Sequence, residues 1–193
     1  MILVAVWQYD SFSWTTKSLS DLGSEQEKAA TLFNSSLVAA GVLAAIFAVG
    51  LKRNPPASRW AAVGPTALFV GALGLVTTGI FKSTEGVEYL VHYYTSGLFW
   101  ALAIVSLLFI GSATMREPAQ RRPGLVIFIT GGFTSAAGIA AVMILQLSPW
   151  GVAIPEFLIA LGVSVCYMIL GVRLFRARPD RSSTQRSHNS EDS

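Results

Sequence analysis

Five long apolar stretches, separated by short polar segments, dominate the hydrophobic pattern of this chain. Each stretch is about 20 to 24 residues long, and none carries a charged residue near its middle. A helix rises 1.5 Å per residue, so about 20 apolar residues cross the roughly 30 Å hydrocarbon core of a bilayer. The pattern predicts an all-α fold, a polytopic membrane helix bundle with five transmembrane helices, at 29–51, 60–81, 89–111, 124–147 and 154–175.

The polar segments divide the chain into three parts. Residues 1–28 form an outer N-terminal segment, residues 29–175 form the transmembrane bundle, and residues 176–193 form an Arg- and Ser-rich tail that we expect to be disordered in the cytoplasm. The composition agrees with a membrane domain, because 13% of the residues are charged against about 25% in a soluble domain.

Lys and Arg are distributed unequally between the two sides of the predicted bundle. Of the 14, three follow the first run, three follow the third, and five lie at the end of the fifth run and in the tail, all on one side. Cytoplasmic loops of membrane proteins carry such an excess. We therefore expect a multi-pass protein of the cell membrane with its N-terminus outside and its C-terminus in the cytoplasm. The basic excess then reflects topology, so membrane lipids and no nucleic acid are the expected partners.

The apolar runs contain few residues that bind metals or cofactors. His92 is the one histidine inside a run, Cys166 is the single cysteine, and no Asp or Glu lies at mid-depth. No set of His, Cys, Asp and Glu has the spacing of metal ligands. We therefore expect neither a metal site nor a cofactor.

Polar residues gather at one depth on the outer side. The first and third predicted helices both run inward from that side, so Asn34 and His92 fall at similar heights just below the interface. Glu85 precedes the third helix, and the segment with Ser20 and Asp21 can fold over this region. The candidate ligand-binding residues are Asp21, Asn34, Glu85 and His92.

Several interpretations of this cluster remain open. The polar groups can simply satisfy each other, because unpaired polar groups are costly in lipid. They can also form a pocket, with Asp21 orienting His92, that binds or senses a lipid headgroup or a small amphiphile. An enzyme is the alternative: a lipid hydrolase or acyl transferase with His92 as base and Ser20 and Asp21 as further catalytic candidates. A homo-oligomer or a membrane partner is also left open.

Four segments carry a resemblance to a known family. They are KSLSDLG at 17–23, LFNSSLVAAG at 32–41, GLVTTGIFKSTEG at 74–86, and the helix from His92 to Phe99. Together they resemble the domain-of-unknown-function 998 family of prokaryotic integral membrane proteins, over roughly residues 10–175. More remotely, they are similar to the Frag1/DRAM/Sfk1 group of eukaryotic membrane proteins, which is linked to lipid handling.

The resemblance implies a fold but no agreed activity. It implies that the residues matching the family's polar motif are Ser20, Asp21, Gly23, Asn34 and His92. The family usually has six spanning helices, and the first is missing or truncated here. Residues 1–9 resemble its last turns, so either the true start lies upstream or this member has lost a span.

Overall fold

The computed structural model describes residues 1–24, 27–53, 62–82, 84–145 and 151–176, and the regular elements in these ranges are all helices, with no strand among them. The elements are α1 (Ile2–Trp7), η1 (Leu19–Gly23), α2 (Glu27–Arg53), α3 (Val63–Ile80), α4 (Gly86–Met115), η3 (Pro118–Gln120), α5 (Arg121–Val126), η4 (Ile127–Phe133), α6 (Thr134–Leu145) and α7 (Ala153–Arg176). Most of the predicted tail, residues 177–193, lies outside the described residues.

Five helical stretches are long and apolar enough to cross a membrane, which confirms the predicted all-α, five-span bundle. They are Glu27–Arg53, Val63–Ile80, Gly86–Met115, Arg121–Ile144 and Ala153–Phe175. The fourth is composite, because α5, the π-helical η4 and α6 follow one another without a break. Each stretch forms a helix because only a helix satisfies every backbone polar group of one segment inside lipid.

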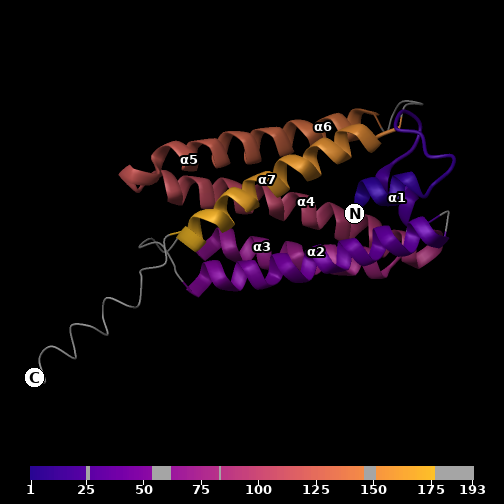
Figure 1. Ribbon diagram of the computed structural model, residues 1–193, viewed down its shortest axis with the longest axis horizontal. Coiled ribbons are helices and arrows are strands. Elements are labelled where there is room, and N and C mark those ends of the chain that lie inside the picture. The colour runs from indigo at the N-terminus through magenta and orange to yellow at the C-terminus, as the bar shows by residue number, and fades with distance from the viewer. Residues whose placement is uncertain (25–26, 54–61, 83, 146–150, 177–193) are drawn as a thin grey trace, which may run out of the picture.

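Neighbouring helices pack through small residues. In Figure 1, α2 lies against α3 and α3 against α4, while α6 and α7 pair on the other side. A Cβ added at Gly41 of α2 would lie 2.8 Å from the carbonyl oxygen of Ala72 in α3, and one at Gly79 of α3 would lie 2.7 Å from that of Asn34. These two glycines therefore let the α2 and α3 backbones approach closely, which is how helices associate in lipid.

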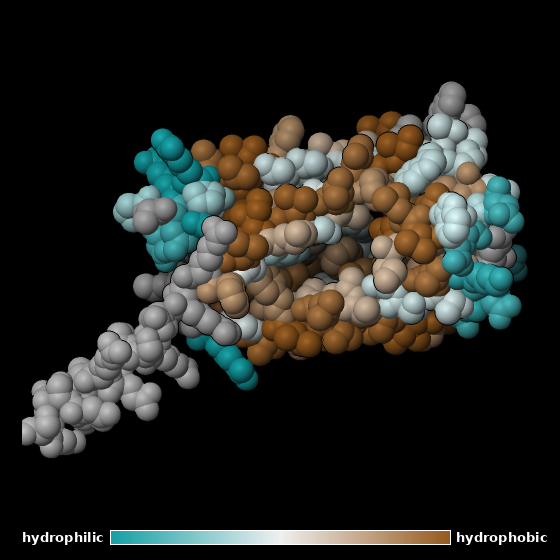
Figure 2. Space-filling view, viewed as in Figure 1, coloured by the Kyte–Doolittle hydropathy of each residue, from teal (hydrophilic) through white to brown (hydrophobic). Residues whose placement is uncertain are grey.

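The surface has an apolar belt between two polar ends. Figure 2 shows hydrophobic residues across the middle and hydrophilic residues at both ends of the long axis. Large apolar side chains such as Leu43, Ile46 and Met168 are exposed within the belt. One end, called the basic end below, holds Lys52 and Arg53 at the end of α2. The opposite end, called the η1 end, holds α1 and η1 (Figure 1). An exposed apolar belt of this size is a lipid-facing surface.

The N-terminal segment is packed onto the bundle at the η1 end. Leu22 is fully buried, and Leu19 nearly so, in a cluster with Ala5, Ala29 and Phe33. A capping box begins η1: the Ser18 side chain accepts from the backbone at position 21, and Asp21 Oδ2 accepts from Ser18 N–H at 2.7 Å. The leucines anchor η1 by hydrophobic burial, and the capping box satisfies its first backbone amides.

Candidate functional site

A cavity of about 190 Å³ lies beneath η1, between α2, α4 and α7. Its lining comes from α1, η1, α2, α3, α4 and α7, and consists of Ile2, Leu19, Ser20, Phe33, Leu37, Ala40, Leu75, Thr78, His92, Ser96, Phe99, Trp100, Glu156, Ala160, Val163 and Ser164. Figure 2 shows a hollow on this face of the molecule, within the apolar belt. The cavity is therefore reached from the side that faces lipid.

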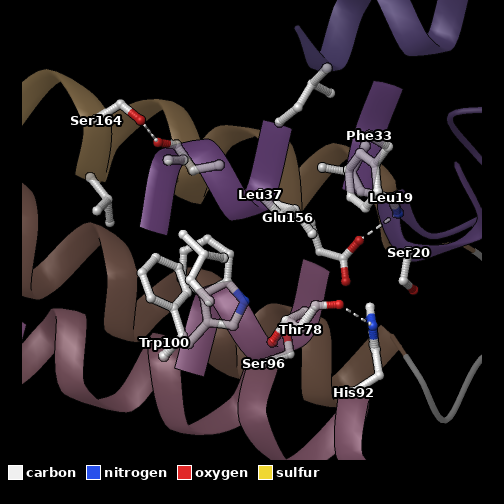
Figure 3. A pocket seen from close by; sticks show the side chains of 16 residues that line it. Leu19, Ser20, Phe33, Leu37, Thr78, His92, Ser96, Trp100, Glu156 and Ser164 are labelled. Carbon is white, nitrogen blue, oxygen red and sulfur yellow. Dashed lines mark hydrogen bonds between the residues drawn. The ribbon is translucent and has the colours of Figure 1, made fainter. Parts of the chain in front are cut away.

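The carboxylate and the imidazole of the lining lie toward the same end of the cavity, and Ser164 lies toward the other. Figure 3 shows the Glu156 carboxylate, Ser20 and the His92 ring toward one end of the cavity, and Trp100 toward the other. Apart from a few hydroxyl groups, the remaining lining is aliphatic or aromatic. A cavity with a polar head region and apolar walls matches the two ends of an amphiphile.

His92 is buried and caps the C-terminal end of α3. Its Nδ1 lies 3.1 Å from the carbonyl oxygen of Thr78 and 2.9 Å from that of Phe81. Carbonyl oxygens only accept, so Nδ1 carries the proton. Thr78 lies in the last turn of α3 and Phe81 is its C-cap residue, where the helix offers no further amide partners. Backbone carbonyls therefore orient the ring, and no hydrogen bond joins His92 to Asp21 among the described residues, so the alternative in which Asp21 orients His92 is not formed.

Glu156 is the charged side chain that lines the cavity. It lies in the first turn of α7, and its Oε2 accepts a hydrogen bond from Leu19 N–H at 2.7 Å. This bond joins η1 to α7, two elements 137 residues apart in the chain. No hydrogen bond or ion pair from another described residue reaches the second oxygen, Oε1. No Lys or Arg belongs to the lining.

Ser20 and Asp21 reach the site in different ways. Ser20 lines the cavity, and its Oγ pairs with the Oγ of Ser18 at 2.7 Å. Asp21 lies outside the lining, and its carboxylate caps η1. Within the described residues, no hydrogen bond connects His92 with Ser20 or Asp21, so a Ser–His–Asp chain is not assembled.

Asn34 and Glu85 also lie outside the lining. Asn34 is buried beside it and donates from Nδ2 to the carbonyl oxygen of Gly23 at 3.0 Å, which holds the end of η1 against α2. Glu85 is exposed at the N-cap of α4. Of the four predicted binding residues, the structure thus brings only His92 to the cavity wall.

Glu156 is the residue that the sequence analysis missed. A signal was present, since a carboxylate inside an apolar span is costly and marks a functional position by default. Its place near the start of the run made it resemble an ordinary interface residue. Thr78 and Trp100 were missed as well, because hydroxyls and aromatics in apolar helices carry no directional signal in the sequence. Within the described ranges, no group of three or more His, Cys, Asp or Glu residues is arranged to hold a metal ion.

The five spans and the lipid-facing cavity define the class of the molecule: a multi-pass helical membrane protein with an amphipathic cavity near one end. The chain belongs to the DUF998 family, described as a protein of unknown function, whose family model matches residues 1–173. This match confirms the resemblance carried by the KSLSDLG and LFNSSLVAAG segments. No curated protein and no solved structure matches the chain.

Proposed function

We propose that the protein binds a lipid headgroup or a small amphiphile in the cavity beneath η1. The observation that carries the proposal is the layout of the lining, with Glu156, Ser20 and His92 at one end and apolar side chains at the other. The volume of about 190 Å³ modestly exceeds an apolar protein cavity of ~150 Å³ that binds benzene. The cavity therefore takes a head region with a few methylene groups, and the rest of an acyl chain extends into lipid.

The proposal also assigns the protein to a particular membrane and gives the bundle an orientation in it. We infer that the protein resides in the cell membrane, with the basic end in the cytoplasm and η1 on the outer side. The support is the placement of Lys52, Arg53 and Arg121 at the basic end, as expected for cytoplasmic termini of spanning helices. The cavity then samples amphiphiles from the outer leaflet.

A cavity-filling variant tests the binding proposal. In Ala160→Phe the added ring occupies space in the lining, whereas Ala137→Phe adds the same ring to an exposed position of α6. We expect wild type and Ala137→Phe to retain a co-purifying amphiphile in native mass spectrometry, and Ala160→Phe to lose most of it. Identical profiles for all three proteins would contradict binding in this cavity.

Binding is favoured over catalysis by the hydrogen bonds. The Oγ of Ser20 pairs with Ser18, and His92 uses Nδ1 for backbone carbonyls, so neither contact activates a nucleophile. The enzyme alternative is tested by incubating the purified protein with lipid vesicles. Release or transfer of acyl chains that disappears in His92→Ala would establish the lipid hydrolase or acyl transferase instead.

A further inference from the structure

We propose that the cavity selects amphiphiles with a positively charged ammonium head, and that Glu156 is the residue that binds this head. The inference rests on the proposed function and narrows it to one ligand class: an amphiphile whose head ends in an ammonium group. Both a bilayer lipid with an amino headgroup and a free long-chain amine belong to this class.

The first argument is the charge of the lining. Glu156 places a carboxylate in a mostly apolar wall, and no Lys or Arg lines the cavity. A charged carboxylate in such surroundings is costly while it is unpaired, and either a proton or an opposite charge relieves that cost. An ammonium head supplies that charge. A phosphate or carboxylate head would instead place a second negative charge in the same cavity without a cation to pair it.

The second argument is the geometry of the Glu156 carboxyl group. Oε2 is fixed by the Leu19 N–H at 2.7 Å, which sets the orientation of the whole group. Oε1 has no partner among the described residues and remains available to accept from a ligand. One held oxygen and one available oxygen form a preorganised acceptor for an N–H donor.

The third argument is the supply of further acceptors at the same end. With the proton on Nδ1, the neutral His92 ring presents Nε2 as an acceptor, and no described residue donates to it. The Ser20 hydroxyl lies in the same part of the lining. A primary ammonium has three donors and no acceptor, so these groups complement it.

The test compares three probes with the same chain and different heads: dodecylamine, which is cationic at neutral pH, dodecanol and dodecanoate. Binding to the purified protein in detergent is measured by isothermal titration calorimetry. For wild type we expect dodecylamine to bind at least about tenfold more tightly than dodecanol, and dodecanoate to bind most weakly, since hydrogen bonds to charged groups are the stronger ones.

Two carboxylate variants separate Glu156 from general surface charge. Glu156→Gln keeps an oxygen that accepts from Leu19 N–H and removes the charge, so it should lose the preference for dodecylamine and keep dodecanol binding. Glu88→Gln removes an exposed carboxylate from the first turn of α4 at the same end, and should behave as wild type.

The outcomes distinguish this inference from the proposed function. Equal binding of dodecylamine and dodecanol, both lost in Ala160→Phe, would overturn ammonium selection and leave amphiphile binding intact. Absence of binding for all three probes would overturn both.

A second experiment distinguishes whether the ammonium group belongs to a bilayer lipid or to a free amine. In nanodiscs of phosphatidylethanolamine mixed with phosphatidylglycerol, retention of phosphatidylethanolamine by wild type and not by Glu156→Gln identifies a bilayer lipid. Dodecylamine binding without such retention identifies a free amine. Retention of phosphatidylglycerol that survives in Glu156→Gln would contradict selection by charge.

Discussion

Asn34 and Gly23 form the contact that holds the end of η1 in place. Asn34 donates from Nδ2 to Gly23 O, and its Oδ1 is buried without a hydrogen-bond partner among the described residues. A Cβ on residue 23 would lie 2.6 Å from that Oδ1 and 3.1 Å from Cδ1 of Phe33. Position 23 therefore requires glycine for steric reasons. The buried Asn34 side chain cannot move away without losing its hydrogen bond to Gly23 O.

Gly23→Ala tests this contact. The methyl group must displace Asn34 or Phe33, and overpacking of this kind costs about 1 to 3 kcal/mol. We expect a lower unfolding temperature for purified Gly23→Ala. Gly97→Ala is the matched control, because a Cβ at Gly97 in α4 meets no atom within 4 Å. Alanine in a helix is favoured over glycine, so Gly97→Ala should be neutral or slightly stabilising. Equal unfolding temperatures for the two variants would contradict the steric argument.

Asp21 stabilises the short helix η1 and does not line the cavity. Its carboxylate accepts from Ser18 N–H, and the residue lies outside the lining. η1 in turn places Leu19 N–H on Glu156 and Ser20 on the cavity wall. Asp21, a predicted ligand-binding residue, thus forms its hydrogen bond within η1, the segment that lies over the cavity.

Asp21→Ala tests the role of the cap. Loss of the acceptor leaves Ser18 N–H unpaired, which should destabilise η1 by about 1 kcal/mol. We expect faster hydrogen exchange of the amides in η1, with the transmembrane helices unchanged. Asp10→Ala removes an exposed carboxylate from the same N-terminal segment and should leave that exchange as in wild type. If Asp21→Ala left η1 protection unaltered, the cap would have no stabilising role.

At the scale of the whole molecule, the two polar ends differ in charge and in architecture. The basic end carries Lys52, Arg53 and Arg121 at helix termini, whereas the η1 end carries a packed segment over a cavity. On the face drawn in Figure 2, mostly hydrophobic residues lie between the two ends, with a hollow among them. In the proposed function, an amphiphile would enter from the bilayer with its head at the η1 end, without crossing the basic end.

Cysteine labelling in intact cells tests the inferred orientation. In a Cys166→Ala background, Asp10→Cys and Glu117→Cys place single thiols at exposed positions of opposite ends. We expect a membrane-impermeant maleimide to label position 10 and spare position 117, because the basic end should face the cytoplasm. Both thiols should react after permeabilisation. Labelling of position 117 alone in intact cells would show that the orientation is opposite to the one inferred.

Much of the architecture could be predicted from the sequence, and less of the site. The run predicted at 89–111 lies within α4 (Gly86–Met115), and α3 (Val63–Ile80) lies within the run predicted at 60–81. His92 was recognised because a lone histidine in an apolar run is unusual. Glu156 was not recognised as a candidate site residue, because its role depends on the residues that surround it in the fold. Its hydrogen-bond partner, Leu19, lies 137 positions away in the chain.

The sequence alone determined that five spanning helices form, because an apolar segment in lipid must satisfy its backbone polar groups within itself. That requirement is local, so the sequence of each apolar run is enough to predict its helix. Only the tertiary structure decided that η1 packs over the space between α2, α4 and α7, and that the second oxygen of Glu156 is left unpaired there. Those facts depend on contacts between distant segments, such as Leu19 N–H with Glu156 and Asn34 Nδ2 with Gly23 O, which no single run of residues specifies.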